Sequence, residues 1–189
     1  MKRILLATLA GGVIIFVWGA VSHMLLGAGM LGVSVMSNED PVLEALSTNL
    51  PEAGLYMFPG WDLEASAFDE PDEAWMNKYR DGPAGMLIYR PKGGEVMPPS
   101  TMVSEFVSNL LAALLFTLLA SALAGSYGKR VALLSLLGLF SWLSISVSYW
   151  IWYHFPLAYI AGEGIDVVFA CVLAAIAIAK IVPAPAAKN

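Results

Sequence analysis

The stretch SYWIWYHFPLAYIAGEGID, residues 148–166, decides the fold. It holds six aromatic side chains, a histidine, a proline and two carboxylates where two apolar runs, residues 131–153 and 157–182, meet. Each run reaches the roughly 20 residues that a helix needs to cross a bilayer. Pro156 suits the first turn of a helix, where no N–H donor is needed. The stretch therefore predicts a helical hairpin that turns at the lipid–water boundary, with its aromatic side chains at headgroup depth.

Two further apolar segments, residues 4–26 and 102–126, are long enough to span a membrane. The chain is 58% hydrophobic and 13% charged, and soluble domains carry about twice that share of charge. Lys2 and Arg3 precede the first segment as in a signal peptide, but its apolar run is longer and no A-x-A-like site follows. We expect it to be kept as an anchor. The sequence predicts an all-α integral membrane protein with four transmembrane helices.

Charge predicts the orientation of these helices. Cytoplasmic ends of membrane helices carry an excess of Lys and Arg. We therefore expect both termini in the cytoplasm, including the tail 183–189, and residues 27–101 outside it. The basic residues that four alternating crossings place on the cytoplasmic side are Lys2, Arg3, Lys129, Arg130, Lys180 and Lys188.

The segment 27–101 is predicted to be a small α+β extracytoplasmic cap inserted between the first and second membrane helices. Asp40 as N-cap, followed by Pro41, predicts a short helix that ends near Pro51. The runs GLYMFPGW and GMLIYRPKGG are bounded by Gly and Pro as strands are, and DEPDEAWMNKYRDG between them reads as a capped helix ending at Gly82. A piece this small needs a further surface to rest on, either the membrane helices or another protein. The aromatic residues expected at that contact are Trp61, Trp75, Tyr56 and Tyr79.

Ionisable residues within the predicted helices all lie in their outer halves. Asp166 is the deepest, about 21 Å from Lys180 along the helix at 1.5 Å per residue. A carboxylate at that depth usually faces the interior of the helix bundle or a water-filled cavity. We expect His23 and Asp166 to be buried in the helix bundle and to interact with each other, with Glu163 nearer the outer membrane surface. Three interpretations of these residues stay open. They form a structural hydrogen bond between helices, they form a proton, ion or small-ligand site, or they face lipid and extend toward the headgroups. Small-residue faces support the inward direction: Gly162, Asp166, Ala170, Ala174 and Ala177; Gly12, Gly19 and His23; and Ser135, Gly138, Ser141, Ser144 and Ser148.

Sharper chemistries have weaker support in the sequence. His23 and His154 lie at similar predicted depth on different helices, which would suit the axial ligands of haem b, but no C-x-x-C-H is present. The methionines around the cap would suit copper, yet they form no tight cluster, so no metal is predicted. Nucleophile, zinc-protease and P-loop motifs are absent from the sequence, and no catalytic residue is predicted. The net charge of −5 does not indicate the basic surface that nucleic-acid binding requires.

Three stretches carry a resemblance to known proteins: GGVIIFVWGAVSHMLL at residues 11–26, YRDGPAGMLIYRP at residues 79–91, and the aromatic stretch at 148–166. Together they are similar to a group of uncharacterised bacterial inner-membrane proteins with this four-helix layout. The resemblance implies this layout and a location in the bacterial inner (cytoplasmic) membrane. It implies no site residues, because the group brings no catalytic residues with it.

The function that the sequence favours is a non-catalytic accessory or structural subunit of a larger membrane protein complex, such as respiratory or photosynthetic electron-transfer machinery. Its partners would be the lipid bilayer and other membrane subunits. The first alternative is a small transporter or ligand-binding membrane protein that uses His23, Glu163 and Asp166. The second alternative is a membrane haem protein.

Overall fold

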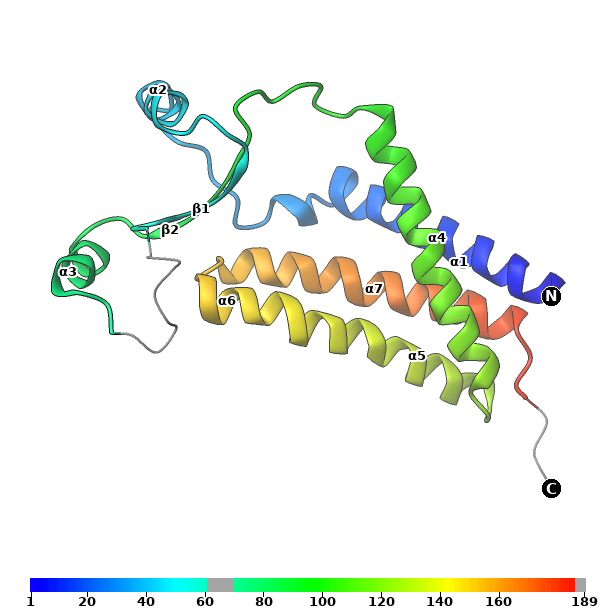
Figure 1. Ribbon diagram of the computed structural model, residues 1–189. Helices are drawn as coiled ribbons and strands as arrows, with labels where there is room; N and C mark the ends of the chain where they lie inside the picture. The colour runs from blue at the N-terminus through cyan, green and yellow to red at the C-terminus, as the bar shows by residue number, and fades with distance from the viewer. Residues whose placement is uncertain (61–69, 186–189) are drawn as a thin grey trace. The chain divides into compact units, whose positions relative to one another are not determined.

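The computed structural model describes residues 1–60 and 70–185. The chain divides into two compact units. Unit 1 comprises Met1–Val33 and Met97–Asn189, and unit 2 comprises Ser34–Val96. Unit 1 contains long helices, whereas unit 2 contains short helices and a sheet (Figure 1). Each unit is described by itself below.

Within the described residues, four helices are long and apolar enough to span a membrane. The first is α1 (Lys2–Ala20), prolonged by the π-helical turn η1 (Val21–Leu25), and the second is α4 (Pro99–Ala122). The third consists of α5 (Tyr127–Ser141), the π-helical turn η3 (Trp142–Ser146) and α6 (Val147–Tyr153). The fourth is α7 (Leu157–Ile181). The predicted fold class is confirmed: a mainly helical chain with these four helices and a small sheet between α1 and α4.

Two helices begin three or four residues earlier than their apolar runs predict. The second starts at Pro99 instead of Met102, with the proline in its first turn. The third starts at Tyr127 instead of Val131, because the Ser126 side chain accepts a hydrogen bond from the backbone N–H of Lys129 and caps the helix. Hydropathy marks where an apolar run begins, and the capping residue decides where the helix begins.

In unit 1, α1 and α7 are central: α1 packs against α4 and α7, and α7 packs against α5 (Figure 1). The buried core lies toward the end where α1 starts and α7 finishes. Small residues dominate it, and they let membrane helices approach closely. The core residues are Ala7, Ala120, Leu134, Ala174, Ala175, Ile178, Ala179 and Val182.

Arg130 closes this end of unit 1. Its buried guanidinium donates hydrogen bonds to the carbonyl oxygens of Ala120 at 2.7 Å, Val182 at 2.8 Å and Ala179 at 3.2 Å. These carbonyls belong to the last turns of α4 and α7, where no further helical N–H is available to them. A positive charge is also favourable at the negative end of a helix dipole. One side chain therefore caps two membrane helices.

The turn between α6 and α7 lies where the aromatic stretch predicts it. His154 adopts the left-handed conformation (φ 56°) that ends α6, and Pro156 precedes the first residue of α7. Three aromatic rings meet at this turn: Tyr149 and Phe155 at 5.5 Å between centroids, and Phe155 and Tyr159 at 5.4 Å. Their position at headgroup depth stays a prediction.

Unit 2 contains α2 (Asp40–Asn49), β1 (Gly54–Phe58), α3 (Glu73–Asp81) and β2 (Gly85–Tyr89). The strands pair antiparallel, and Tyr56 lies opposite Leu87. The helix, strand, helix and strand occur in the predicted order. The expected N-cap of α2 is wrong, because Asp40 is the first helical residue and Glu39 precedes it without a side-chain cap. The acid then lies within the positive end of the helix dipole instead of capping it.

Candidate functional site between η1 and the first half of α7

The structure brings His23 and Asp166 together. His23 lies in η1, and its Nε2 is 3.3 Å from Oδ2 of Asp166 in the third turn of α7. A second tie joins the same helices, because the indole N–H of Trp18 donates to the backbone carbonyl of Asp166 at 3.0 Å. Trp18 also stacks on Phe169, with ring centroids 5.6 Å apart. Asp166 is thus held by α1 through both its backbone and its carboxylate.

Glycines let a turn of backbone cover the histidine. Gly27 takes a left-handed conformation (φ 65°), which sends the chain into the short helix η2 (Ala28–Met30). A Cβ at Gly29 would collide with Nδ1 of His23, and a Cβ at Gly162 would collide with the carbonyl oxygen of Ala28. η2 can therefore lie against both His23 and α7 only because these positions are glycine. Sequence reasoning missed this contact, although the spacing of glycines in LGAGMLG was its signal.

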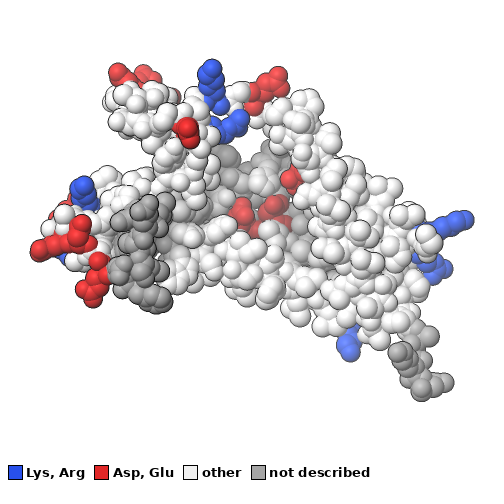
Figure 2. Space-filling view, in the orientation of Figure 1, with Lys and Arg blue, Asp and Glu red and all other residues white. Residues whose placement is uncertain are grey.

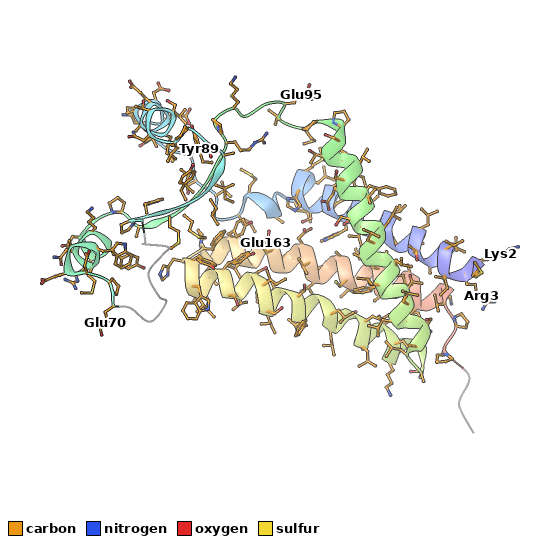
Figure 3. All side chains as sticks on the ribbon, in the orientation of Figure 1. Lys2, Arg3, Glu70, Tyr89, Glu95 and Glu163 are labelled. Carbon is orange, nitrogen blue, oxygen red and sulfur yellow. The ribbon has the colours of Figure 1, made fainter. Side chains whose placement is uncertain are left out.

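Within this chain the pair is only partly buried, so its full burial stays a prediction. The side chain of His23 is 49% exposed and that of Asp166 is 27% exposed within this chain. Oδ1 of Asp166 is buried and has no hydrogen-bond partner among the described residues. Glu163 is half-buried near the start of α7 (Figure 3). Its carboxylate interacts with the side chain of Tyr159 one turn earlier. His23 lies in the π-helical turn η1, which departs from the 3.6-residue period on which the expected inward direction rests.

The small-residue faces are only partly as predicted. On α7, Gly162 and Ala174 are buried. On α1, a Cβ at Gly12 would press on Leu110, whereas nothing lies within 4 Å of one at Gly19, so the two glycines do not share a packed face. On the third membrane helix, the hydroxyls of Ser135, Ser144 and Ser148 donate to carbonyls three or four residues earlier in the same helix.

The two histidines have different surroundings. His154 lies in the turn between α6 and α7 with an exposed side chain. His23 has Asp166 beside Nε2 and the backbone at Gly29 beside Nδ1. Among residues 1–60 and 70–185, no three His, Cys, Asp or Glu side chains are grouped so that they could hold a metal ion.

The aromatic residues expected at an interface mostly contact each other within unit 2. The indole N–H of Trp75 donates to the carbonyl oxygen of Gly60 at 2.8 Å, and its ring stacks on Tyr79 with centroids 5.2 Å apart. The Tyr56 hydroxyl donates to the carbonyl oxygen of Glu52 at 2.9 Å. Trp61 lies outside the described residues. Whether these side chains contact another protein stays a prediction.

Charges are sparse along the helices of unit 1. Away from the basic end, the visible helical surface is uncharged except for a few acidic side chains (Figure 2). Lys2 and Arg3 lie at the start of α1, at the opposite end of unit 1 from Glu163 (Figure 3). Unit 1 therefore has one basic end and one end with a histidine and acids.

No protein-family model matches this chain, and no curated protein or solved structure is significantly similar to it.

Proposed function

We propose that this protein is a non-catalytic subunit of a larger membrane protein complex. The observation that carries the proposal is the incomplete cover over His23 and Asp166. Asp166 is nine residues into α7, about 14 Å from its start, which is within the hydrocarbon layer if α7 spans the membrane. Polar side chains at that depth almost always face protein or water, because lipid cannot satisfy them. Another subunit that packs over the outer halves of α1 and α7 would supply this cover.

The close packing at the basic end of unit 1 favours an accessory subunit over a transporter. A transporter needs a polar route that can open to both sides of the membrane. Here the polar residues lie toward one end of α1 and α7, and the other end is filled by the alanine-rich core and by Arg130. The same residues would suit a small ligand that enters from the outer side, which keeps ligand binding as the second candidate function.

Haem binding has less support. An axial histidine presents one ring nitrogen to the iron. At His23, Asp166 engages Nε2 and the backbone at Gly29 lies beside Nδ1, so pairing with Asp166 is the better account of this residue.

The orientation belongs to the same proposal. Exposed Lys2, Arg3, Lys129 and Lys180 all flank one end of unit 1, and such residues favour the cytoplasmic side. Unit 2, which is joined to the other ends of α1 and α4, would then lie outside the cytoplasm. The membrane would be the bacterial inner membrane.

Extraction in a mild detergent tests the proposal. Wild-type protein is expected to purify with other membrane proteins in a fixed ratio. Asp166→Leu should reduce their recovery several-fold, whereas Asp166→Asn should retain most of it because the amide oxygen still accepts a hydrogen bond from His23. The measurement is the subunit ratio by native mass spectrometry. Recovery of the wild-type chain alone, as a monomer or a dimer of itself, would contradict the proposal.

A further inference from the structure

The described residues of unit 2, 34–60 and 70–96, form no buried core of their own. None of its described residues is buried, although it contains two helices and a two-stranded sheet. An isolated two-stranded hairpin is marginally stable in water and needs a further strand, a helix or another surface to pack against. Unit 2 therefore depends on a surface that covers part of it.

The two faces of its sheet are not equivalent. One face carries Tyr56, Phe58, Leu87 and Tyr89, and here the rings pack on their own strands. Phe58 lies over Gly85, where an added Cβ would come within 2.9 Å of the ring. Tyr56 and Tyr89 meet edge to face, with centroids 6.3 Å apart. On this face Tyr56, Leu87 and Tyr89 are half-buried, and Phe58 is 43% exposed.

The opposite face carries aliphatic side chains and no such cover. The register places Leu55 opposite Ile88 and Met57 opposite Met86, so these four side chains share one face. Leu55 is 64% exposed, Met57 54% and Ile88 83%, whereas Met86 is half-buried. We call these four residues the aliphatic face. A contiguous exposed apolar surface of this kind is typical of an interaction site.

Charge indicates what covers the aliphatic face. Residues 34–96 contain twelve Asp and Glu against four Lys and Arg, a net charge of −8. Figure 2 shows acidic side chains at several places on unit 2. Anionic lipid headgroups and a second copy of unit 2 would both be repelled by this charge. A basic protein surface would be attracted, and complementary charge speeds association and excludes wrong partners.

We infer that the aliphatic face is the docking surface for a basic extramembrane segment of another subunit, a segment with an apolar centre and Lys or Arg around it. The inference rests on the proposed function and goes further, because it assigns the extramembrane contact to four residues and gives the chemistry of the partner. The apolar centre would bury the aliphatic face, and the net negative charge of unit 2 would attract the basic residues of the partner.

Photocrosslinking in intact cells tests the inference without disturbing the fold. A benzophenone amino acid is placed at Ile88 on the aliphatic face, or at Val96 as control, since Val96 is fully exposed in the same unit but lies off the sheet. Position 88 is expected to give an adduct with another polypeptide, and the crosslinked peptide is expected to carry more Lys and Arg than Asp and Glu. In isolated membranes its yield should fall several-fold between about 0.05 and 0.5 M salt.

Matched variants provide the second readout. Leu55→Ser combined with Ile88→Ser should lower co-purification of the crosslinked partner several-fold, and Val96→Ser should leave it unchanged. An adduct with lipid alone, with the same chain or with a second copy would overturn the inference, as would an acidic crosslinked peptide. If wild-type protein has partners but the double variant retains them all, this inference fails and the proposed function stands. If wild-type protein has no partner, the proposed function itself fails.

Discussion

Replacement of Arg130 by methionine is expected to lower the free energy of unfolding of the protein by about 3–5 kcal/mol. Methionine keeps much of the apolar volume but donates no hydrogen bond. The carbonyls of Ala120, Ala179 and Val182 would then be left in a buried site without their donor. Thermal unfolding in detergent, followed by circular dichroism, measures the loss.

Two further variants make the Arg130 experiment specific. Lys129→Met removes a neighbouring charge that is exposed, so it should change the stability by less than about 0.5 kcal/mol. Arg130→Lys should fall between the two, because one ammonium cannot reproduce the fork that reaches both α4 and α7. Equal stabilities for Arg130→Met and Lys129→Met would show that Arg130 contributes only its charge.

Replacement of Gly11 by leucine should give the second large effect. A Cβ at Gly11 would lie 2.7 Å from Cδ1 of Ile178 and 3.1 Å from Cβ of Ala113, so α1 would have to move away from both α7 and α4. Overpacking of this kind costs about 1–3 kcal/mol. Gly19→Leu is the matched control on the same helix, because nothing lies within 4 Å of a Cβ there.

The control at Gly19 removes the contribution of helix propensity. Leucine is a better helix former than glycine by roughly 0.8 kcal/mol, and this gain is common to both variants. Gly19→Leu is therefore expected to be neutral or stabilising, and Gly11→Leu to be destabilising, in the same unfolding measurement. If Gly11→Leu were as stable as Gly19→Leu, the close packing of α1 between α4 and α7 would be wrong.

The architecture was predictable because it follows from the length and hydropathy of the apolar runs and from the Gly, Pro and capping residues that bound the shorter elements. Apolar runs of more than twenty residues identify the membrane helices, and Pro156 fixes the last turn. Gly and Pro bound the two short strands, and Asp72 caps α3 by accepting a hydrogen bond from the backbone N–H of Trp75. Each signal is local, so one sequence carries it. The resemblance to uncharacterised four-helix membrane proteins stays an expectation.

The predicted pairing of His23 with Asp166 followed from helix depth, but its surroundings did not. A helical wheel assumes 3.6 residues per turn, and η1 departs from that period at His23 itself. The backbone cover at Gly29 depends on a turn after the helix, which periodicity does not describe. The role of Arg130 was hidden for another reason: a basic residue at a membrane-helix end looks the same whether it faces the cytoplasm or caps two neighbouring helices.

Crosslinking from within the membrane tests most directly whether another protein covers the outer half of α7. Ile165 adjoins Asp166, and Ile176 lies three turns further along α7 on the same face with similar exposure. A diazirine amino acid at position 165, activated in intact cells, is expected to form an adduct with another polypeptide, and position 176 serves as the reference for labelling at the opposite end. If position 165 labelled only lipid, the site at His23 and Asp166 would be uncovered in the cell, and the account of this protein as a subunit would be wrong.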